Sequence, residues 1–212
     1  MTRSIWPKLS AALLLWTAIA CSPTTPSDEA PAPSTPAASE APATTTPKPQ
    51  DSIYVVDGTW TNQQGHAFEI ASLQGAPTAI AMIFTHCGHA CPTMVANMKE
   101  AQTTLPANLR DRVQWVLITF DIEHDTPEVL ARYAQSQRLN DQWILLHGSE
   151  AQVRMISMLL GIQYTLLENG HYNHSNILTV LDKNGAITQQ FEGLEAQTAK
   201  VVQAIQRADT PQ

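Results

Sequence analysis

The sequence is short of basic residues. Lysine and arginine together number 12, against 19 aspartate and glutamate residues, so the formal net charge of the 212-residue chain is −7. No basic run occurs beyond Arg3 and Lys8, at the N-terminus. Binding to DNA or RNA needs clustered basic side chains that neutralise phosphates. We therefore expect no nucleic-acid partner.

A hydrophobic run long enough to span a membrane is missing from the N-terminus. Leu9–Ala20 are mostly apolar, but this segment falls short of the roughly 20 residues that a membrane-spanning helix needs. It resembles instead the apolar region of a secretory signal peptide, preceded by the positive charges of Arg3 and Lys8. Small residues come just before Cys21, as in a bacterial lipobox. An ordinary cleavage site beside an incidental cysteine is the alternative.

We therefore expect residues 1–21 to be a lipoprotein signal peptide and Cys21 to carry the lipid. Lipoprotein acylation attaches several chains, which is enough for stable membrane anchoring. This predicts a protein of the bacterial cell envelope, anchored to a membrane by its N-terminal lipid, with its domain in the periplasm or another extracytoplasmic space.

Large apolar residues are almost absent from residues 22–50, which are rich in Pro, Ala, Thr and Ser. Such a segment cannot bury enough surface to offset the entropy of ordering it. Its prolines favour an extended, semi-rigid chain. We interpret residues 22–50 as a disordered tether and residues 51–212 as a single globular domain.

The pattern of the domain alternates strands with helices. Residues 77–84 are apolar almost throughout, which is typical of a central strand covered on both faces. The other expected elements are strands at 67–71, 111–120 and 143–146, helices at 93–103, 127–137 and 149–161, a hairpin of 177–181 with 186–191, and a helix at 195–207. This order predicts an α/β fold with a central sheet, helices on both faces, and a C-terminal hairpin and helix. In such sheets a functional loop commonly follows a central strand, here residues 85–91.

Two of the three cysteines, Cys87 and Cys91, lie in that loop and at the start of the following helix. At a spacing of four, their side chains can approach within about 6 Å, which allows a disulfide. A helix N-terminus also lowers the pKa of nearby thiols. A structural disulfide, a redox pair and a metal site all remain open on these grounds. Two thiolates suit Cu(I), and an added imidazole suits Cu(I) or Cu(II).

Four sequence blocks resemble the Sco/SenC family. Residues 84–92, FTHCGHACP, are similar to its C-x-x-x-C-P signature, and residues 118–134, ITFDIEHDTPEVLARYA, are similar to its strand, Asp-rich turn and helix. Residues 143–148, WILLHG, and 173–187, NHSNILTVLDKNGAI, resemble the next two blocks. The blocks occur in the family's order and span nearly the whole domain from Trp60 onward.

The resemblance implies a thioredoxin-like fold that binds copper, as Cu(I) or Cu(II), through two cysteines and a distant histidine. Carried over to this chain, the metal ligands are Cys87, Cys91 and His174. The implied function is delivery of copper to the dinuclear copper centre of cytochrome c oxidase, or to another copper protein, and the implied redox chemistry is a Cys87–Cys91 disulfide. The family usually has Asp where this chain has Asn173. We expect the protein to be a monomer.

Four further residues are candidates for auxiliary roles. His86 and His89 flank Cys87, and each is a fourth ligand, a transient copper-transfer site or a solvated loop histidine; His171 is interpreted in the same way. Asp121 matches a family Asp near the site and is expected to add polarity around the ligands. We expect Asp125 to cap the helix that follows it.

Rival functions differ in how they use the cysteine pair. A thiol–disulfide oxidoreductase fits the fold, although the spacing is C-x-x-x-C rather than C-x-x-C. A copper or redox sensor would use the same residues without delivering the metal. A peroxiredoxin is excluded because Thr85 lies only two positions before Cys87. A structural zinc site would need a fourth strong ligand that the sequence does not assure.

Overall fold

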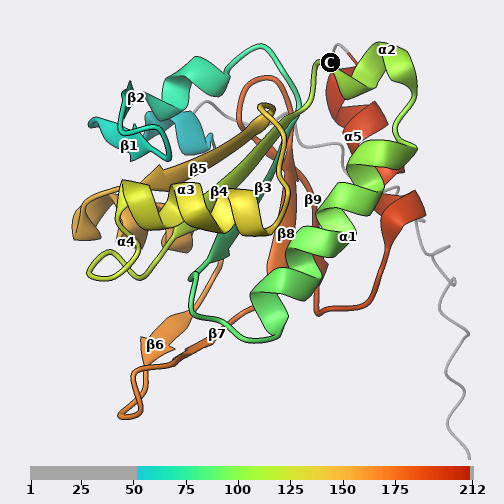
Figure 1. Cartoon of the computed structure of the whole chain (residues 1–212). Coiled ribbons are helices and arrows are strands. Elements are labelled where there is room, and N and C mark those ends of the chain that lie inside the picture. Colours follow the sequence, from blue (N-terminus) through green and yellow to red (C-terminus); the bar gives the residue numbers. More distant parts are fainter. Residues whose placement is uncertain (1–51, 211–212) are drawn as a thin grey trace, which may run out of the picture. The chain divides into compact units, whose positions relative to one another are not determined.

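The computed structural model describes residues 52–210 (Figure 1). The expected signal peptide at residues 1–21, with Cys21, and the expected tether at residues 22–50 lie outside the described residues. Those assignments stay predictions. Within residues 52–210, no helix combines the length and the apolar character that crossing a membrane requires.

A seven-stranded mixed sheet forms the centre of the domain, in the order β2-β1-β5-β4-β3-β8-β9. The three central strands, β3 (Thr78–Ile83), β4 (Gln114–Thr119) and β5 (Trp143–His147), run parallel to one another. The flanking strands are antiparallel to their neighbours: β1 (Trp60–Asn62), β2 (Ala67–Phe68), β8 (Ile177–Leu181) and β9 (Ile187–Glu192).

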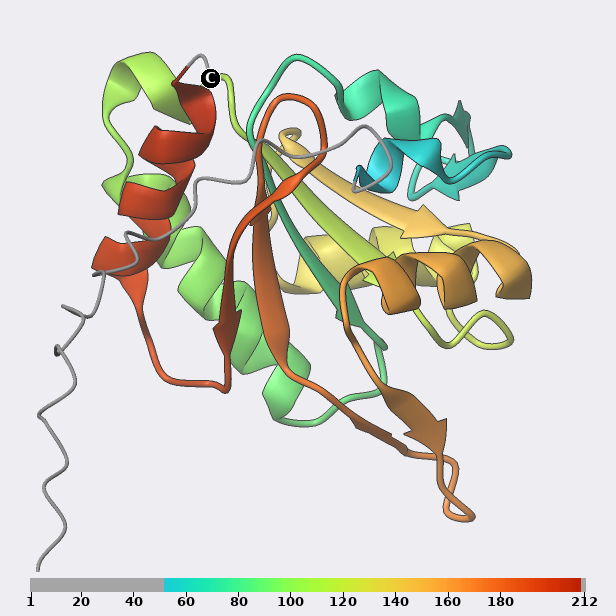
Figure 2. The same cartoon turned by 180° about the vertical axis from the view of Figure 1, so that it is seen from behind.

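Helices cover both faces of this sheet. Figures 1 and 2 show α1 (Ala90–Thr104) and α3 (Pro127–Ser136) over one face, and α4 (Glu150–Leu159) over the other. The C-terminal α5 (Thr198–Asp209) packs against α1, β8 and β9, and the short α2 (Ala107–Arg110) follows α1. Every residue of β3 is buried, as expected of a strand with helices on both sides. The predicted mixed α/β, thioredoxin-like fold is confirmed.

Local signals explain several helix boundaries. Ser149 caps α4: its hydroxyl accepts from the backbone N–H of Gln152, whose side chain accepts in return from the N–H of Ser149. This reciprocal arrangement satisfies two N–H groups that the first helical turn leaves free. Helix α1 begins at Ala90, three residues before the predicted start, so Cys91 lies in its first turn.

The predicted strand at residues 67–71 is wrong beyond its first two residues. Strand β2 ends at Phe68, and Ile70–Leu73 form a 3-10 helix, η3. Ile70 and Leu73 are both buried, and a spacing of three places both on one side of a helical turn. A second short 3-10 helix, η2 (Ile53–Val55), begins the described residues.

A separate two-stranded hairpin projects beyond the central sheet, below it in Figure 1. It consists of β6 (Tyr164–Leu166) and β7 (Tyr172–His174), which pair in antiparallel register. The sequence did not predict it. Its strands have only three residues each, and their partly exposed side chains lack the alternating apolar pattern of a strand.

Candidate metal centre

The chemistry-bearing residues meet at one edge of the sheet. The carboxyl ends of β3 and β4 lie there because the two strands are parallel. The loop after β3 carries Cys87 and leads into α1, which carries Cys91 in its first turn. The hairpin strand β7 ends at His174 and returns the chain to β8, the antiparallel neighbour of β3.

The three predicted metal ligands lie together at this edge. Cys87, Cys91 and His174 each direct one candidate ligand atom to within 4.8 Å of the other two. The backbone N–H of Cys91 donates to the sulfur of Cys87 at 3.3 Å, and the sulfur of Cys91 lies 4.0 Å from Nε2 of His174. Two sulfurs and one imidazole nitrogen form a soft donor set, which suits Cu(I) among the common metals.

A backbone carbonyl just after β7 determines the tautomer of His174. Nδ1 lies 3.1 Å from the carbonyl oxygen of Ser175. A carbonyl only accepts, so Nδ1 carries the proton and donates it. Nε2, which faces Cys91, is therefore left with its lone pair free. Metal-binding histidines commonly use this arrangement to fix the orientation and the basicity of the ring.

Aromatic side chains surround His174 and join the hairpin to the sheet. The imidazole packs edge-on against Phe84, at 5.8 Å between ring centroids, and is tilted against Phe120 at 5.1 Å. Tyr164 and Tyr172 of the hairpin pack on Phe120 at 5.2 and 5.0 Å. Sequence reasoning missed this cluster. One signal was available, because Tyr172 lies two positions before His174 and therefore on the same side of the strand.

The two cysteines are free thiols in different surroundings. Cys91 is fully buried, whereas Cys87 is partly exposed. Burial raises the pKa of Cys91 far above its ordinary value, because a thiolate loses its solvation there. The expected lowering of the pKa by the helix N-terminus is therefore wrong for Cys91. A metal that binds Cys91 must displace its proton. The predicted Cys87–Cys91 disulfide stays a prediction.

Alkylation of the reduced, metal-free protein should distinguish the two thiols. We expect iodoacetamide to label Cys87 first and Cys91 at least about tenfold more slowly, because burial hinders access and keeps that thiol protonated. Mass spectrometry of peptides from a time course would measure both rates. Unfolding in urea should make the rates similar, and equal rates in the folded protein would contradict the geometry.

The auxiliary histidines lie outside the cluster of two sulfurs and one nitrogen. His86 is exposed, and its Nδ1 lies 3.9 Å from Oδ1 of Asp125. The ligand atoms of His86 group with those of Asp121 and Asp125. His89 is exposed just before α1, and His171 is exposed in the hairpin. Neither belongs to a metal-spaced group among residues 52–210.

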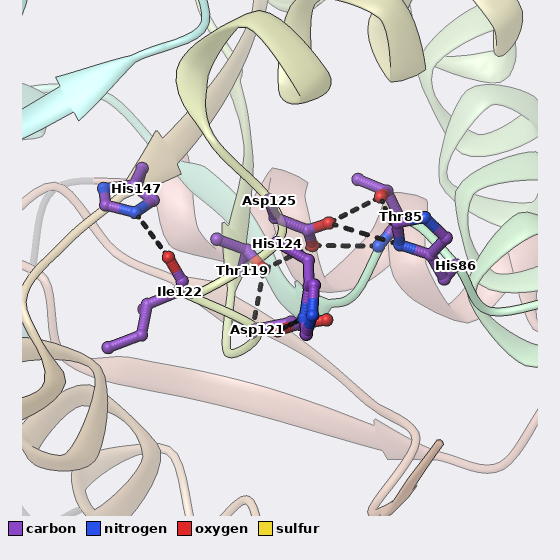
Figure 3. A network of polar contacts seen from close by, with 8 residues as sticks. All are labelled: Thr85, His86, Thr119, Asp121, Ile122, His124, Asp125 and His147. Carbon is purple, nitrogen blue, oxygen red and sulfur yellow. Dashed lines mark hydrogen bonds and ion pairs between the residues drawn. The ribbon is translucent and has the colours of Figure 1, made fainter. Parts of the chain in front are cut away.

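The expected capping role of Asp125 is wrong. Its carboxylate is fully buried and accepts hydrogen bonds from the backbone N–H of Thr85 at 2.9 Å, from the Thr85 hydroxyl and from the Thr119 hydroxyl at 2.6 Å (Figure 3). Thr126 stands at the cap position of α3 instead, without a side-chain cap. Asp125 thus fastens the loop that carries Cys87 to the end of β4.

Comparison with known proteins places this geometry in a family. The SCO1/SenC family model matches residues 48–209. Among solved structures, Bradyrhizobium japonicum ScoI with copper bound is 25% identical, covers 71% of this chain and 96% of its own, and superposes with a TM-score of 0.60. BsSco, described as a member of the Sco family of cytochrome c oxidase assembly proteins with a disulfide switch, is 25% identical, with coverages of 74% and 94% and a TM-score of 0.64.

A curated relative gives a similar result. The SCO2-like protein of Rickettsia typhi is 30% identical over 136 residues, which cover 61% of this chain and 66% of the relative. The chain spans slightly less than two thirds of the length of the first curated relatives that it matches. The family model covers most of the chain and all of the strands and helices that hold the cysteines and the histidine. The chain belongs to the SCO1/SenC family.

Proposed function

We propose that this protein binds one copper ion through Cys87, Cys91 and His174 and delivers it to the dinuclear copper centre of cytochrome c oxidase or to another copper protein. The observation that carries the proposal is the convergence of two sulfurs and one imidazole nitrogen within 4.8 Å. The copper-bound relative supports the choice of metal. The relative described as an assembly protein supports the destination.

The residues fit copper by the chemistry of their donors. Thiolates select Cu(I) over harder ions, and imidazole accepts either oxidation state. The hydrogen bond from Nδ1 of His174 to Ser175 directs the free lone pair of Nε2 toward Cys91. The rings of Phe84 and Phe120 pack against the imidazole of His174 and hold it in place.

Access to the ion differs among the three ligands. The side chain of Cys91 is buried in the interior of the domain, whereas those of Cys87 and His174 are half-buried at its surface. A partner that presents its own sulfur or nitrogen ligands can therefore reach the ion from the side of Cys87 and His174. Such ligand exchange suits a protein that releases its metal to an acceptor.

The membrane anchor expected from Cys21 and the tether expected at residues 22–50 belong to the same proposal. A lipid at Cys21 would hold the copper-binding domain near a membrane on the extracytoplasmic side. The tether would let the domain reach a membrane-bound acceptor. Labelling with radioactive palmitate, with a Cys21→Ala variant as control, would test the anchor.

A thiol–disulfide oxidoreductase is the second candidate, favoured by the hydrogen bond that Cys87 accepts from the N–H of Cys91. In that reaction the two thiols would become a disulfide, and two electrons and two protons would pass to a target disulfide, which becomes a dithiol. The same oxidation would abolish copper ligation, because copper binds the thiolates.

Copper titration of the reduced protein tests the proposal. We expect one Cu(I) per chain, held tightly against a competing chelator, and no comparable binding after the cysteine pair is oxidised. Atomic absorption and competition with bicinchoninic acid would measure both. A reduced protein that fails to hold copper, but reduces a model disulfide, would favour the oxidoreductase.

A further inference from the structure

A second group of metal-ligand side chains lies beside the cysteine site, with different donors. The ligand atoms of His86, Asp121 and Asp125 all lie within 4.8 Å of one another. His124 lies beside this group, with its Nδ1 2.8 Å from Oδ1 of Asp121. The rings of His86 and His124 are 6.3 Å apart between centroids. Figure 3 shows His86 beside Asp125 and His124 beside Asp121.

The carboxylates of this cluster are buried, yet lack a strong cationic partner. The side chains of Asp121 and Asp125 are 4% and 0% exposed. Within residues 52–210, their only ion pairs are with His86 and His124, and neither contacts a lysine or an arginine. Buried carboxylates are costly unless they are paired with a cation or coordinate a metal.

Hydrogen bonding explains only part of the cluster. The bonds of Asp125 to Thr85 and Thr119 account for its burial. The hydrogen bonds of Asp125 do not explain why a second carboxylate, that of Asp121, is buried beside it. They also do not explain why two imidazoles, those of His86 and His124, lie next to these carboxylates with 68% and 64% of their side chains exposed. One side of the cluster is thus buried and anionic, and the other is open to solvent.

We propose that His86, Asp121 and Asp125, with His124 beside them, form a second metal site for a divalent ion, Cu(II) in preference to Zn(II). Imidazole and carboxylate are donors that both ions accept, and Cu(II) binds such donors more tightly. At about 2.1 Å from the ion, adjacent ligand atoms are about 3.0 Å apart in the square-planar geometry that Cu(II) prefers and about 3.4 Å apart in a tetrahedral zinc site. The distances of 2.8 Å from His124 to Asp121 and 3.9 Å from His86 to Asp125 lie on either side of these values.

The new site is separate from the cysteine site but shares its loop. His86 directly precedes Cys87, and its Nδ1 lies toward Asp125 rather than toward the sulfurs. The two sites differ in hardness, with sulfur and nitrogen donors in one and nitrogen and oxygen donors in the other. The second site does not depend on the proposed delivery of copper.

The second site can be tested in a protein that lacks the sulfur donors of Cys87 and Cys91. In the full chain with Cys87→Ser and Cys91→Ser, we expect Cu(II) to bind at one ion per chain. Its electron paramagnetic resonance spectrum should show nitrogen and oxygen ligands, and its visible absorption spectrum should show no thiolate-to-copper charge-transfer band. Isothermal titration with Zn(II) alone should give weaker binding at the same stoichiometry. Zn(II) binding as tight as Cu(II) binding would overturn the stated preference.

Single variants in the same background identify the ligands. His86→Ala and His124→Ala should each weaken Cu(II) binding by at least about 10- to 100-fold, since losing even an outer partner of a ligand costs that much. Both side chains are largely exposed, so circular dichroism and the melting temperature should not change. His89→Ala and Glu123→Gln are matched controls, because they alter an exposed histidine and an exposed acid next to the cluster.

Three results would overturn the second site. These are the absence of Cu(II) binding in the double-serine background, binding that survives both His86→Ala and His124→Ala, and binding that His174→Ala or His89→Ala weakens equally. Failure of the cysteine site to hold Cu(I) would leave this test unaffected, because both cysteines are absent from the background in which it is made.

Discussion

A His174→Ala variant of the reduced protein is expected to bind Cu(I) at least about 100-fold more weakly than the wild type. Loss of a partner that merely orients a metal ligand costs about 10- to 100-fold in affinity, and here the ligand itself is removed. Nε2 of His174 faces the sulfur of Cys91 at 4.0 Å, so its loss leaves only the two thiolates. Competition with a chromophoric Cu(I) chelator would measure the change.

The matched control for this variant is His171→Ala. His171 is an exposed histidine on the same hairpin, outside any metal-spaced group among residues 52–210. It should keep wild-type affinity. If both variants bind copper as tightly as the wild type, the cysteines alone hold the ion and the three-residue site is wrong. Disulfide-reducing activity should survive His174→Ala, because that reaction needs only the two thiols.

An Asp125→Ala variant should lose about 3 kcal/mol of unfolding free energy. The substitution removes a buried acceptor of three hydrogen bonds. Each bond to a charged group contributes about 1.5–3 kcal/mol, and donors left buried without a partner add to the loss. The net value is lower than the sum because the hydroxyls of Thr85 and Thr119 can turn toward other acceptors.

Thermal and urea unfolding would measure this effect. A loss of that size corresponds to a fall in melting temperature of about 6–12 °C for a domain of this size. Asp141→Ala, which removes an exposed carboxylate in a loop, should change the melting temperature by no more than about 2 °C. An Asp125→Ala protein as stable as this control would show that the loop before Cys87 does not depend on the carboxylate.

Much of the fold could be predicted because its signals are local. The apolar run at residues 77–84 indicated a strand covered on both faces, and β3 is buried at every position. Ser149 correctly predicted the start of α4, where both hydrogen bonds of the capping box with Gln152 are present. The hairpin of β6 and β7 lacked such signals, since its strands are stabilised by distant aromatic residues such as Phe120.

The candidate site was predictable in part for the same reason. Cys87 and Cys91 stood out by their spacing, but His174 was identified only through the resemblance to a family. The role of Asp125 could not be read from its neighbours, because its partner Thr85 lies 40 positions away in the chain. The placement of His86 and His124 beside two buried carboxylates likewise depends on how β3 and β4 pair.

The separation of 83 positions between Cys91 and His174 also sets an order of events for a newly made chain. The histidine reaches the sulfurs only when β8 has paired with β3, a contact between distant segments that closes late because of its entropic cost. A chain still emerging or in transit can offer copper the cysteines alone. Tight binding of copper by all three ligands thus requires the completed fold. The bound ion in turn raises the free energy of unfolding of the folded domain.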